Sequence, residues 1–362
     1  MGKREYKKYN KRLLALTLSI IAVLALFNII IDPFNAFDVP KVQGFNKIKP
    51  DKNRQQRVTK VVELKFDKSK IDAVFIGSSR VDGSIEPSYY KELTGKNSKN
   101  LAMNALTHSE TVNLVQNVVK IHPEIKTVYI GLDFFRFLKG QSEEGRSVNI
   151  TSNPKLTINE VNPLVLSFDT IVASFNTLLW NVQKKPEPDR AGGESSFLHR
   201  LGQYKGTYEN STLDNKEFKK LLDLKKELNA QDINVVFYLN PTHASDLYLI
   251  KELGYENVLN EWKKELAQNF DYYDFDFANY ATSEPINSKT KYFYESSHST
   301  RNMGRLVIDS LLIGCDDSVC RKVTKYNVDE ANAGNAKALL NWENNDRYSA
   351  EKVREIVKNN AI

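Results

Sequence analysis

The longest uninterrupted apolar stretch of the chain lies close to its N-terminus. Residues 13–31 contain no charged residue, and Asp32-Pro33 ends the run. At about 1.5 Å of rise per residue, a helix of this length spans the roughly 30 Å hydrocarbon core of a bilayer. A cleaved signal peptide would have a shorter apolar run and a small-x-small cleavage site, which the sequence after Ile31 lacks. The pattern therefore predicts an uncleaved transmembrane signal anchor over residues 13–31.

The charge of the chain is concentrated before that run. Residues 1–12 carry six basic side chains and one acidic one, out of a formal net charge of +6 for the whole chain. The basic flank predicts that residues 1–12 stay in the cytoplasm and that the C-terminal domain lies outside it, in a single-pass membrane protein. The remainder is close to neutral, so charge gives no reason to expect nucleic-acid binding.

After the anchor, short apolar runs rich in β-branched residues alternate with stretches of helical periodicity. The runs predict buried strands, since their length and flanking residues favour strands over helices. The predicted strands are 71–76, 100–103, 127–135, 233–239 and 272–277, and the clearest helices are 56–66, 110–121, 216–229, 250–269 and 300–312. Such alternation is typical of α/β proteins. We expect a three-layer α/β/α sandwich with a mostly parallel five-stranded sheet.

The same pattern predicts the domain organisation. Residues 32–70 form a juxtamembrane segment, 71–312 the α/β domain, and 313–362 a C-terminal helical appendage. Nearly one hundred residues separate the third and fourth strands, so we expect an insertion at about 140–215 that serves as a lid or binds an acceptor. Cys315 and Cys320, the two cysteines of the chain, form either a local disulfide or two free thiols.

Two segments more than two hundred residues apart carry candidate chemistry. Ser79 follows the first predicted strand, and His298 comes three residues after Glu295 near the end of the chain. A serine hydroxyl is a poor nucleophile at neutral pH, so it needs a neighbouring base and a third group to orient that base. These segments together supply that set. Alternatively, Ser79 is a helix N-cap, His298 a surface or capping histidine, and Glu295 an exposed loop acid.

The ordered set of motifs resembles the SGNH, or GDSL-type, hydrolase superfamily. It resembles most closely the membrane-anchored extracytoplasmic branch that includes the teichoic acid D-alanyl transfer protein and the alginate O-acetyltransferases. The motifs are Asp32-Pro33-Phe34, Gly77-Ser78-Ser79-Arg80, Asn100-Leu101-Ala102-Met103-Asn104-Ala105, Gly131-Leu132-Asp133 and Glu295-Ser296-Ser297-His298. The resemblance implies a flavodoxin-like fold of SGNH type, with Ser79 as nucleophile and His298 as general base. Glu295 stands where the family has aspartate.

The resemblance also implies an oxyanion hole, and this chain departs from the family there. Ala105 stands at the position of a family glycine, and Asp133 at that of a donor asparagine. A carboxylate accepts hydrogen bonds and would repel an oxyanion. Either Asp133 points elsewhere, or Asn104 or Asn240 supplies the donor, or the hole has two donors. Arg80 is either a ligand for an acidic substrate group or a solvated side chain.

These residues predict an extracytoplasmic serine-dependent acyltransferase with a Ser-His-Glu triad. The resemblance implies O-acetyl transfer to an envelope or exported polysaccharide, with a membrane-bound O-acyltransferase as partner. Two alternatives stay open, namely a carbohydrate esterase or O-deacetylase and a catalytically weak glycan-binding or scaffold protein. No phosphate loop, His-Glu-x-x-His motif or nucleic-acid module occurs in the sequence, so we expect no cofactor and no metal.

Overall fold

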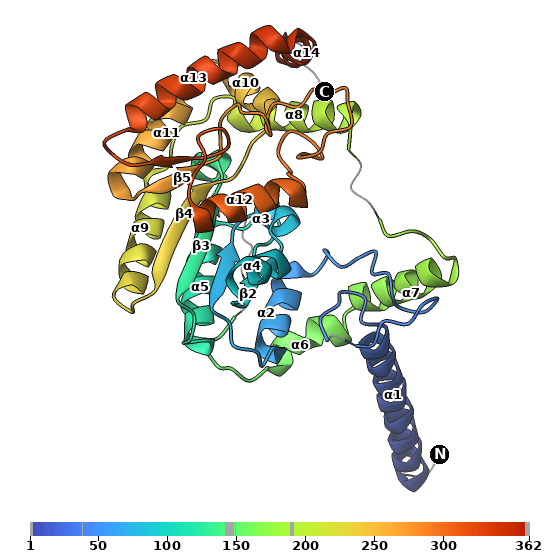
Figure 1. Ribbon diagram of the computed structural model, residues 1–362. Coiled ribbons are helices and arrows are strands. Elements are labelled where there is room, and N and C mark those ends of the chain that lie inside the picture. Colours follow the sequence, from blue (N-terminus) through green and yellow to red (C-terminus); the bar gives the residue numbers. More distant parts are fainter. Residues whose placement is uncertain (1–2, 38, 142–147, 149, 189–191, 359–362) are drawn as a thin grey trace. The chain divides into compact units, whose positions relative to one another are not determined.

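The computed structural model describes residues 3–37, 39–141, 148, 150–188 and 192–358 (Figure 1). The chain divides into two compact units, one formed by Met1–Lys68 and Ser147–Asp189 and the other by Ser69–Arg146 and Arg190–Ile362. The segment 140–215, which the sequence analysis treats as one insertion, is therefore shared between the two units. Residues 142–147, 149 and 189–191 of that segment, and 359–362 of the predicted appendage, lie outside the described residues.

The first unit is helical. Its elements are α1 (Lys3–Ile31), α2 (Gln56–Phe66), α6 (Ile158–Val165) and α7 (Phe168–Val182). Within α1, the stretch Arg4–Ile31 is long and apolar enough to cross a membrane. The predicted anchor thus forms one continuous helix with the basic tail that precedes it.

A small core joins α2, α6 and α7. It consists of five buried residues, Phe34, Ala36, Val62, Leu164 and Ala173. Beside it, Lys65 of α2 forms a buried ion pair with Glu160 of α6, with 2.5 Å between Nζ and Oε1. The segment after the anchor therefore packs against residues about one hundred positions later in the chain.

The second unit is built on a sheet that has six strands within the described residues, in the order β2-β1-β3-β4-β5-β6. The strands are β1 (Ala73–Ile76), β2 (Ser98–Asn100), β3 (Thr127–Leu132), β4 (Asn234–Leu239), β5 (Tyr272–Asp274) and β6 (Arg321–Val323). The first five pair in parallel, and β6 runs antiparallel to β5. The predicted number of five strands is one too low, because β6 comes from the region predicted to be a helical appendage.

Helices lie between the strands of this sheet and, as α13 and α14, after its last strand. They are α3 (Ser79–Ser84), α4 (Pro87–Thr94), α5 (His108–Ile121), α8 (Glu194–Tyr208), α9 (Asn215–Asn229), α10 (Ala244–Glu252), α11 (Glu256–Asn269), α12 (Arg301–Ile313), α13 (Val328–Asn345) and α14 (Arg347–Lys358), together with the 3₁₀ helix η1 (Phe134–Phe137). The predicted helix 250–269 is two helices, α10 and α11, because Gly254 adopts a left-handed conformation between them.

Both faces of the sheet are covered. On one face, Phe75 and Tyr129 pack in a cluster with Val81 of α3 and Met303 of α12. Their neighbours Val74 and Ile130 point to the other face and are equally buried, since successive side chains of a strand alternate between faces. The sheet is therefore buried on both sides, as expected for parallel strands joined by helices.

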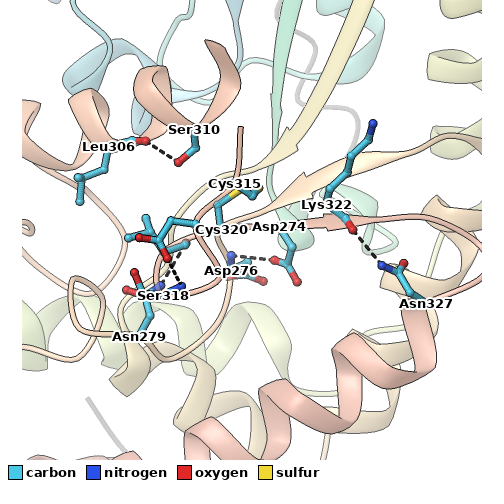
Figure 2. The surroundings of a disulfide bond; sticks show 12 residues. Asp274, Asp276, Asn279, Leu306, Ser310, Cys315, Ser318, Cys320, Lys322 and Asn327 are labelled. Carbon is cyan, nitrogen blue, oxygen red and sulfur yellow. Dashed lines mark hydrogen bonds between the residues drawn. A yellow bond between two sulfur atoms is a disulfide. The ribbon is translucent and has the colours of Figure 1, made fainter. Parts of the chain in front are cut away.

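The two cysteines lie between α12 and β6, where they form a disulfide (Figure 2). Cys320 is buried in the cluster that covers the α3 and α12 face of the sheet. The bond closes the turn that directs the chain from α12 into the edge strand. Of the two alternatives for these residues, the structure contains the disulfide.

Candidate functional site

The carboxyl ends of β1, β3 and β4 meet at one edge of the sheet. Ile76 pairs with Ile130, and Leu132 pairs with Leu239, so the residues that follow these strands emerge together. The chain order reverses here, because β2 and β3 lie on opposite sides of β1. Ligands of open α/β sheets bind at such a reversal, outside the carboxyl ends of the strands.

The turn after β1 presents Ser79 at this edge. A Cβ on Gly77 or on Gly131 would lie 2.5 Å from Cγ2 of Val81, so both glycines allow α3 to approach the strands closely. Ser78 is the N-cap of α3, and its hydroxyl accepts a hydrogen bond from the backbone N–H of Arg80 at 3.2 Å. Capping is thus the role of Ser78, which leaves the partly exposed Ser79 side chain available for another contact.

That contact is with His298. Ser79 Oγ lies 2.7 Å from His298 Nε2, although the two residues are 219 positions apart. Close packing of α12 against α3 holds the two segments together, since a Cβ on Gly304 would lie 2.0 Å from the carbonyl oxygen of Ser84. The glycine in the first turn of α12 therefore allows the histidine turn to reach the serine turn.

Glu295 accepts a hydrogen bond on the other side of the imidazole ring. His298 Nδ1 bonds to Glu295 Oε1. A carboxylate only accepts hydrogen bonds, so Nδ1 is the donor in this pair. In the neutral imidazole, Nε2 then carries the lone pair and accepts the Ser79 hydroxyl proton. The three side chains form one directed chain of hydrogen bonds.

Glu295 is buried and surrounded by donors. Its Oε2 accepts the backbone N–H of Ser297 at 3.0 Å and the Nε–H of Arg200 at 3.2 Å. Burial by itself raises the pKa of Glu295, but the hydrogen bond and charge of His298, together with Arg200 and the Ser297 N–H, lower it from 4.5 to about 2. Glu295 is therefore ionised at neutral pH, and it is not an exposed loop acid.

Arg200 was not among the residues singled out in the sequence. It lies in α8, in the second half of the predicted insertion, 95 residues before Glu295. No motif or spacing connects the two positions, so the contact follows only from the tertiary structure. Its consequence is that a helix of the insertion supplies a positive charge to the carboxylate.

Asp133 has different partners. Its Oδ1 accepts a hydrogen bond from Asn240 Nδ2 at 2.9 Å and lies 3.4 Å from Nε of Arg80. The pairing of Leu132 with Leu239 places Asp133 and Asn240 side by side. Arg80 is buried and also donates to Thr242 Oγ1 at 2.9 Å. Arg80 is therefore not a solvated side chain, and its guanidinium is paired with groups inside the protein.

The remaining predicted positions, Asn104 and Ala105, form the turn before α5. Asn104 is exposed, and Ala105 has φ 54°, in the left-handed region. That conformation is strained for alanine and free of strain for glycine. The backbone at Ala105 thus keeps a conformation that suits glycine, the residue expected there from the resemblance. Among the described residues, no group of three or more His, Cys, Asp or Glu side chains is arranged to hold a metal ion.

No protein-family model and no curated protein matches this chain. The geometry of the site and the motifs are therefore what support a function for this protein.

Proposed function

We propose that this protein is a serine-dependent acyltransferase of SGNH type that transfers an acyl group, most simply acetyl, to a hydroxyl of a glycan outside the cytoplasm. The observation that carries the proposal is the hydrogen-bonded series Ser79–His298–Glu295 at the carboxyl edge of the sheet. A nucleophile, a base and an ionised carboxylate that orients the base are the parts that acyl transfer requires.

In the first half of the proposed reaction, Ser79 Oγ attacks the carbonyl carbon of the acyl donor. His298 Nε2 takes the hydroxyl proton, and Glu295 stabilises the resulting imidazolium through Nδ1. The tetrahedral intermediate collapses when its bond to the donor oxygen breaks. That oxygen leaves with the proton from Nε2, and the acyl group stays on Ser79 as an ester.

In the second half, the acceptor hydroxyl attacks the acyl-enzyme. His298 Nε2 removes the proton of that hydroxyl, the new ester bond forms, and the bond to Ser79 Oγ breaks. The serine regains its proton from Nε2, and the enzyme is restored. Water as the acceptor would make the same residues an esterase.

The location fits a product outside the cytoplasm. The helix α1 is long and apolar enough to span a membrane, and the basic residues at its start favour a cytoplasmic N-terminus. The disulfide Cys315–Cys320 is of a kind that persists in oxidising compartments. An acyl donor used there must be delivered across the membrane, and the resemblance implies a membrane-bound O-acyltransferase as the partner that does so.

The test uses the purified full chain in detergent with p-nitrophenyl acetate as donor and a panel of neutral and acidic oligosaccharides as acceptors. We expect nitrophenolate release that depends on Ser79 and rises with a suitable acceptor, and an acetylated oligosaccharide detected by mass spectrometry. Ser79-dependent release with acetate as the product under every condition would support the esterase. Release equal in wild type and Ser79→Ala would contradict both enzymatic functions and favour a glycan-binding role.

A further inference from the structure

The outward face of α7 is unusually apolar. Five large, exposed apolar side chains recur along it at alternating spacings of four and three residues. We call them the apolar stripe: Phe168, Val172, Phe175, Leu179 and Val182. Ile158 and Leu166, in the segment before α7, are also exposed. Phe168 is 78% exposed, Phe175 51% and Leu179 55%. Such spacing places all five on one side of a helix.

The opposite side of α7 faces the interior of the first unit, and it is small and largely polar. Its buried residues are Thr170, Ala173, Ser174, Thr177 and Asn181. Asn181 exchanges hydrogen bonds with the backbone of Ile48, at 2.9 Å and 2.8 Å. A helix at the surface of a water-soluble protein has the reverse arrangement, with its large apolar side chains inside. The solvent that suits the apolar stripe is therefore not water.

The contacts of α7 with α1 fix where this stripe lies along the candidate membrane span. The rings of Phe27 and Phe175 are 5.0 Å apart, and beside this contact Asn28 Nδ2 donates to the carbonyl oxygen of Val165, the last residue of α6, at 2.8 Å. Phe27 precedes the last residue of α1, Ile31, by four positions, or about 6 Å along the helix axis. Figure 1 shows α7 running across the C-terminal end of α1.

Polar groups mark that end of α1. The ammonium of Lys49 donates to the carbonyl oxygen of Ile31. Asp32 Oδ1 accepts the backbone N–H of Ala36 at 2.7 Å. The last turn of α1 is therefore where the chain passes from an apolar to a polar environment, and α7 crosses it at that depth.

We propose that α7 lies in the interface of the membrane that α1 crosses, with the apolar stripe buried among the acyl chains next to the headgroups. A penetration of about 5–10 Å is usual for such helices, which agrees with the depth of Phe175. Trp180, whose ring centroid lies 4.9 Å from the Lys185 ammonium, is of a residue type enriched at that boundary. The occupant of the surface is lipid.

A second membrane span formed by α6 and α7 is disfavoured by the same contacts. With 15 residues, α7 is about 22 Å long, which is shorter than a bilayer core of roughly 30 Å. It meets α6 at a bend of 46°, and α6 holds Glu160 in its buried ion pair with Lys65. The length of α7, the bend and the charged residue in α6 therefore fit helices that lie along the membrane surface better than helices that cross the membrane.

The test is depth-dependent quenching of a fluorophore in the full chain, reconstituted at high lipid excess into phosphatidylcholine–phosphatidylglycerol vesicles. Both native cysteines are in the disulfide, so single cysteines take the label selectively under non-reducing conditions. The labelled variants are Val172→Cys, Phe175→Cys and Leu179→Cys. Asp169→Cys and Asn176→Cys are the matched controls, since both are exposed and adjacent to stripe residues. Leu18→Cys in the middle of α1 reports insertion of the anchor.

We expect spin labels near the lipid headgroup to quench the stripe positions roughly two or more times as strongly as they quench the control positions. At the stripe positions, these shallow labels should also quench more strongly than spin labels deep in the acyl chains. Leu18→Cys should respond most to the deep label. Stripe positions quenched only by aqueous iodide would contradict the proposal, and so would protection from every quencher, which indicates a protein partner or a second copy. Strongest quenching of the stripe by the deep label would indicate a span instead. Because these readouts do not involve Ser79, they stand or fall independently of acyl transfer.

Discussion

Two carboxylates lie at the same edge of the sheet in surroundings that give them different tasks. Glu295 belongs to the turn before α12, where it accepts hydrogen bonds from His298, Arg200 and the Ser297 N–H. Asp133 follows β3, where it accepts from Asn240 and pairs with Arg80. Glu295 has a titratable, partly exposed partner that can pass a proton to Ser79. The partners of Asp133 are a permanently charged arginine and a neutral amide, neither of which releases or accepts a proton at neutral pH.

The difference teaches that the neighbours of a carboxylate, more than its position after a strand, decide what it does. The resemblance implies an oxyanion donor, asparagine, at position 133, where this chain has aspartate. In the structure, Asp133 balances the buried charge of Arg80, and Arg80 also bonds to Thr242. The Asp133 carboxylate is buried, and its charge is offset by that of Arg80.

Replacing Ser79 or His298, the two residues in the hydrogen-bonded series with Glu295, should have the largest effect on activity. Ser79→Ala and His298→Ala should each lower kcat for acyl transfer by about 10⁴-fold or more, because the nucleophile and its base act as a unit. The double variant should be no slower than either single one. Steady-state release of nitrophenolate measures both.

Ser78→Ala is the control for these substitutions. It removes the N-cap of α3 and should lower the free energy of unfolding by about 1 kcal/mol, with a modest effect on kcat. A Ser78→Ala variant as inactive as Ser79→Ala would show that the turn, and not one hydroxyl, is what the reaction needs.

Glu295→Gln should come next, with a loss of about 10³-fold in kcat. The amide keeps the size of the side chain but removes the charge that fixes the tautomer of the neutral imidazole and stabilises the imidazolium. Ser297→Ala is the matched control, since it deletes a neighbouring donor and leaves the Glu295 charge in place. Near wild-type activity in Glu295→Gln would remove the distinction between the two carboxylates.

The pH dependence of stability checks the same residue without an activity assay. A carboxyl whose folded pKa is lowered, here from 4.5 to about 2, contributes stability that is present above its unfolded pKa and is lost as the pH falls toward its folded pKa. The difference in free energy of unfolding between wild type and Glu295→Gln, roughly 3 kcal/mol at most, should shrink between pH 5 and pH 3 when measured by urea titration. A difference that stays constant would contradict the assignment of the low pKa to Glu295.

Asp133→Asn should act mainly on stability. Losing a carboxylate partner of a buried arginine typically costs about 3–5 kcal/mol. Here the cost is softened by Thr242 and by Asp246, whose Oδ2 lies 3.7 Å from Arg80 Nη2. Activity per folded molecule should stay within a few-fold of wild type. Thermal unfolding combined with active-site titration separates the two quantities. A stable but inactive Asp133→Asn would move the orienting role from Glu295 to the end of β3.

Ala105→Gly should have the smallest effect. Relieving the strain of alanine in a left-handed conformation should raise the free energy of unfolding by about 1–2 kcal/mol. The greater conformational freedom of glycine in the unfolded chain should lower it by about 0.4–1 kcal/mol. We expect a stability gain of roughly 0.5–1 kcal/mol in chemical denaturation. A loss of stability would indicate that the methyl group makes packing contacts that outweigh the strain.

Much of the sheet was predictable from the sequence because its strands are buried. Runs such as Ile71–Ile76 and Ile233–Leu239 are continuous, apolar and bounded by turn residues, and burial on both faces produces that pattern. By contrast, β6 is an edge strand of three residues that includes Arg321 and Lys322, so it carries no such signal. The break between α10 and α11 was missed because the helical periodicity continues across Gly254.

The candidate site was predictable to a similar extent. Ser79, His298 and Glu295 were found because each stands in a recognisable local setting, and the structure brings them together. Arg200 was not found, because a contact across 95 residues leaves no local pattern. The contact of Asp133 with Asn240 follows from the register between β3 and β4. That register depends on both strands together, so the sequence of either strand alone does not predict it.

The central claim is that Ser79 is a nucleophile activated by His298. The most direct measurement is reaction of the folded full chain with a fluorophosphonate probe, followed by mapping of the modified residue by mass spectrometry. Such probes modify serine hydroxyls that a neighbouring base activates. We predict modification at Ser79 that is absent in Ser79→Ala, strongly slowed in His298→Ala and unchanged in Asp133→Asn after correction for the folded fraction. No modification of the wild type, or modification of another serine in its place, would contradict the account.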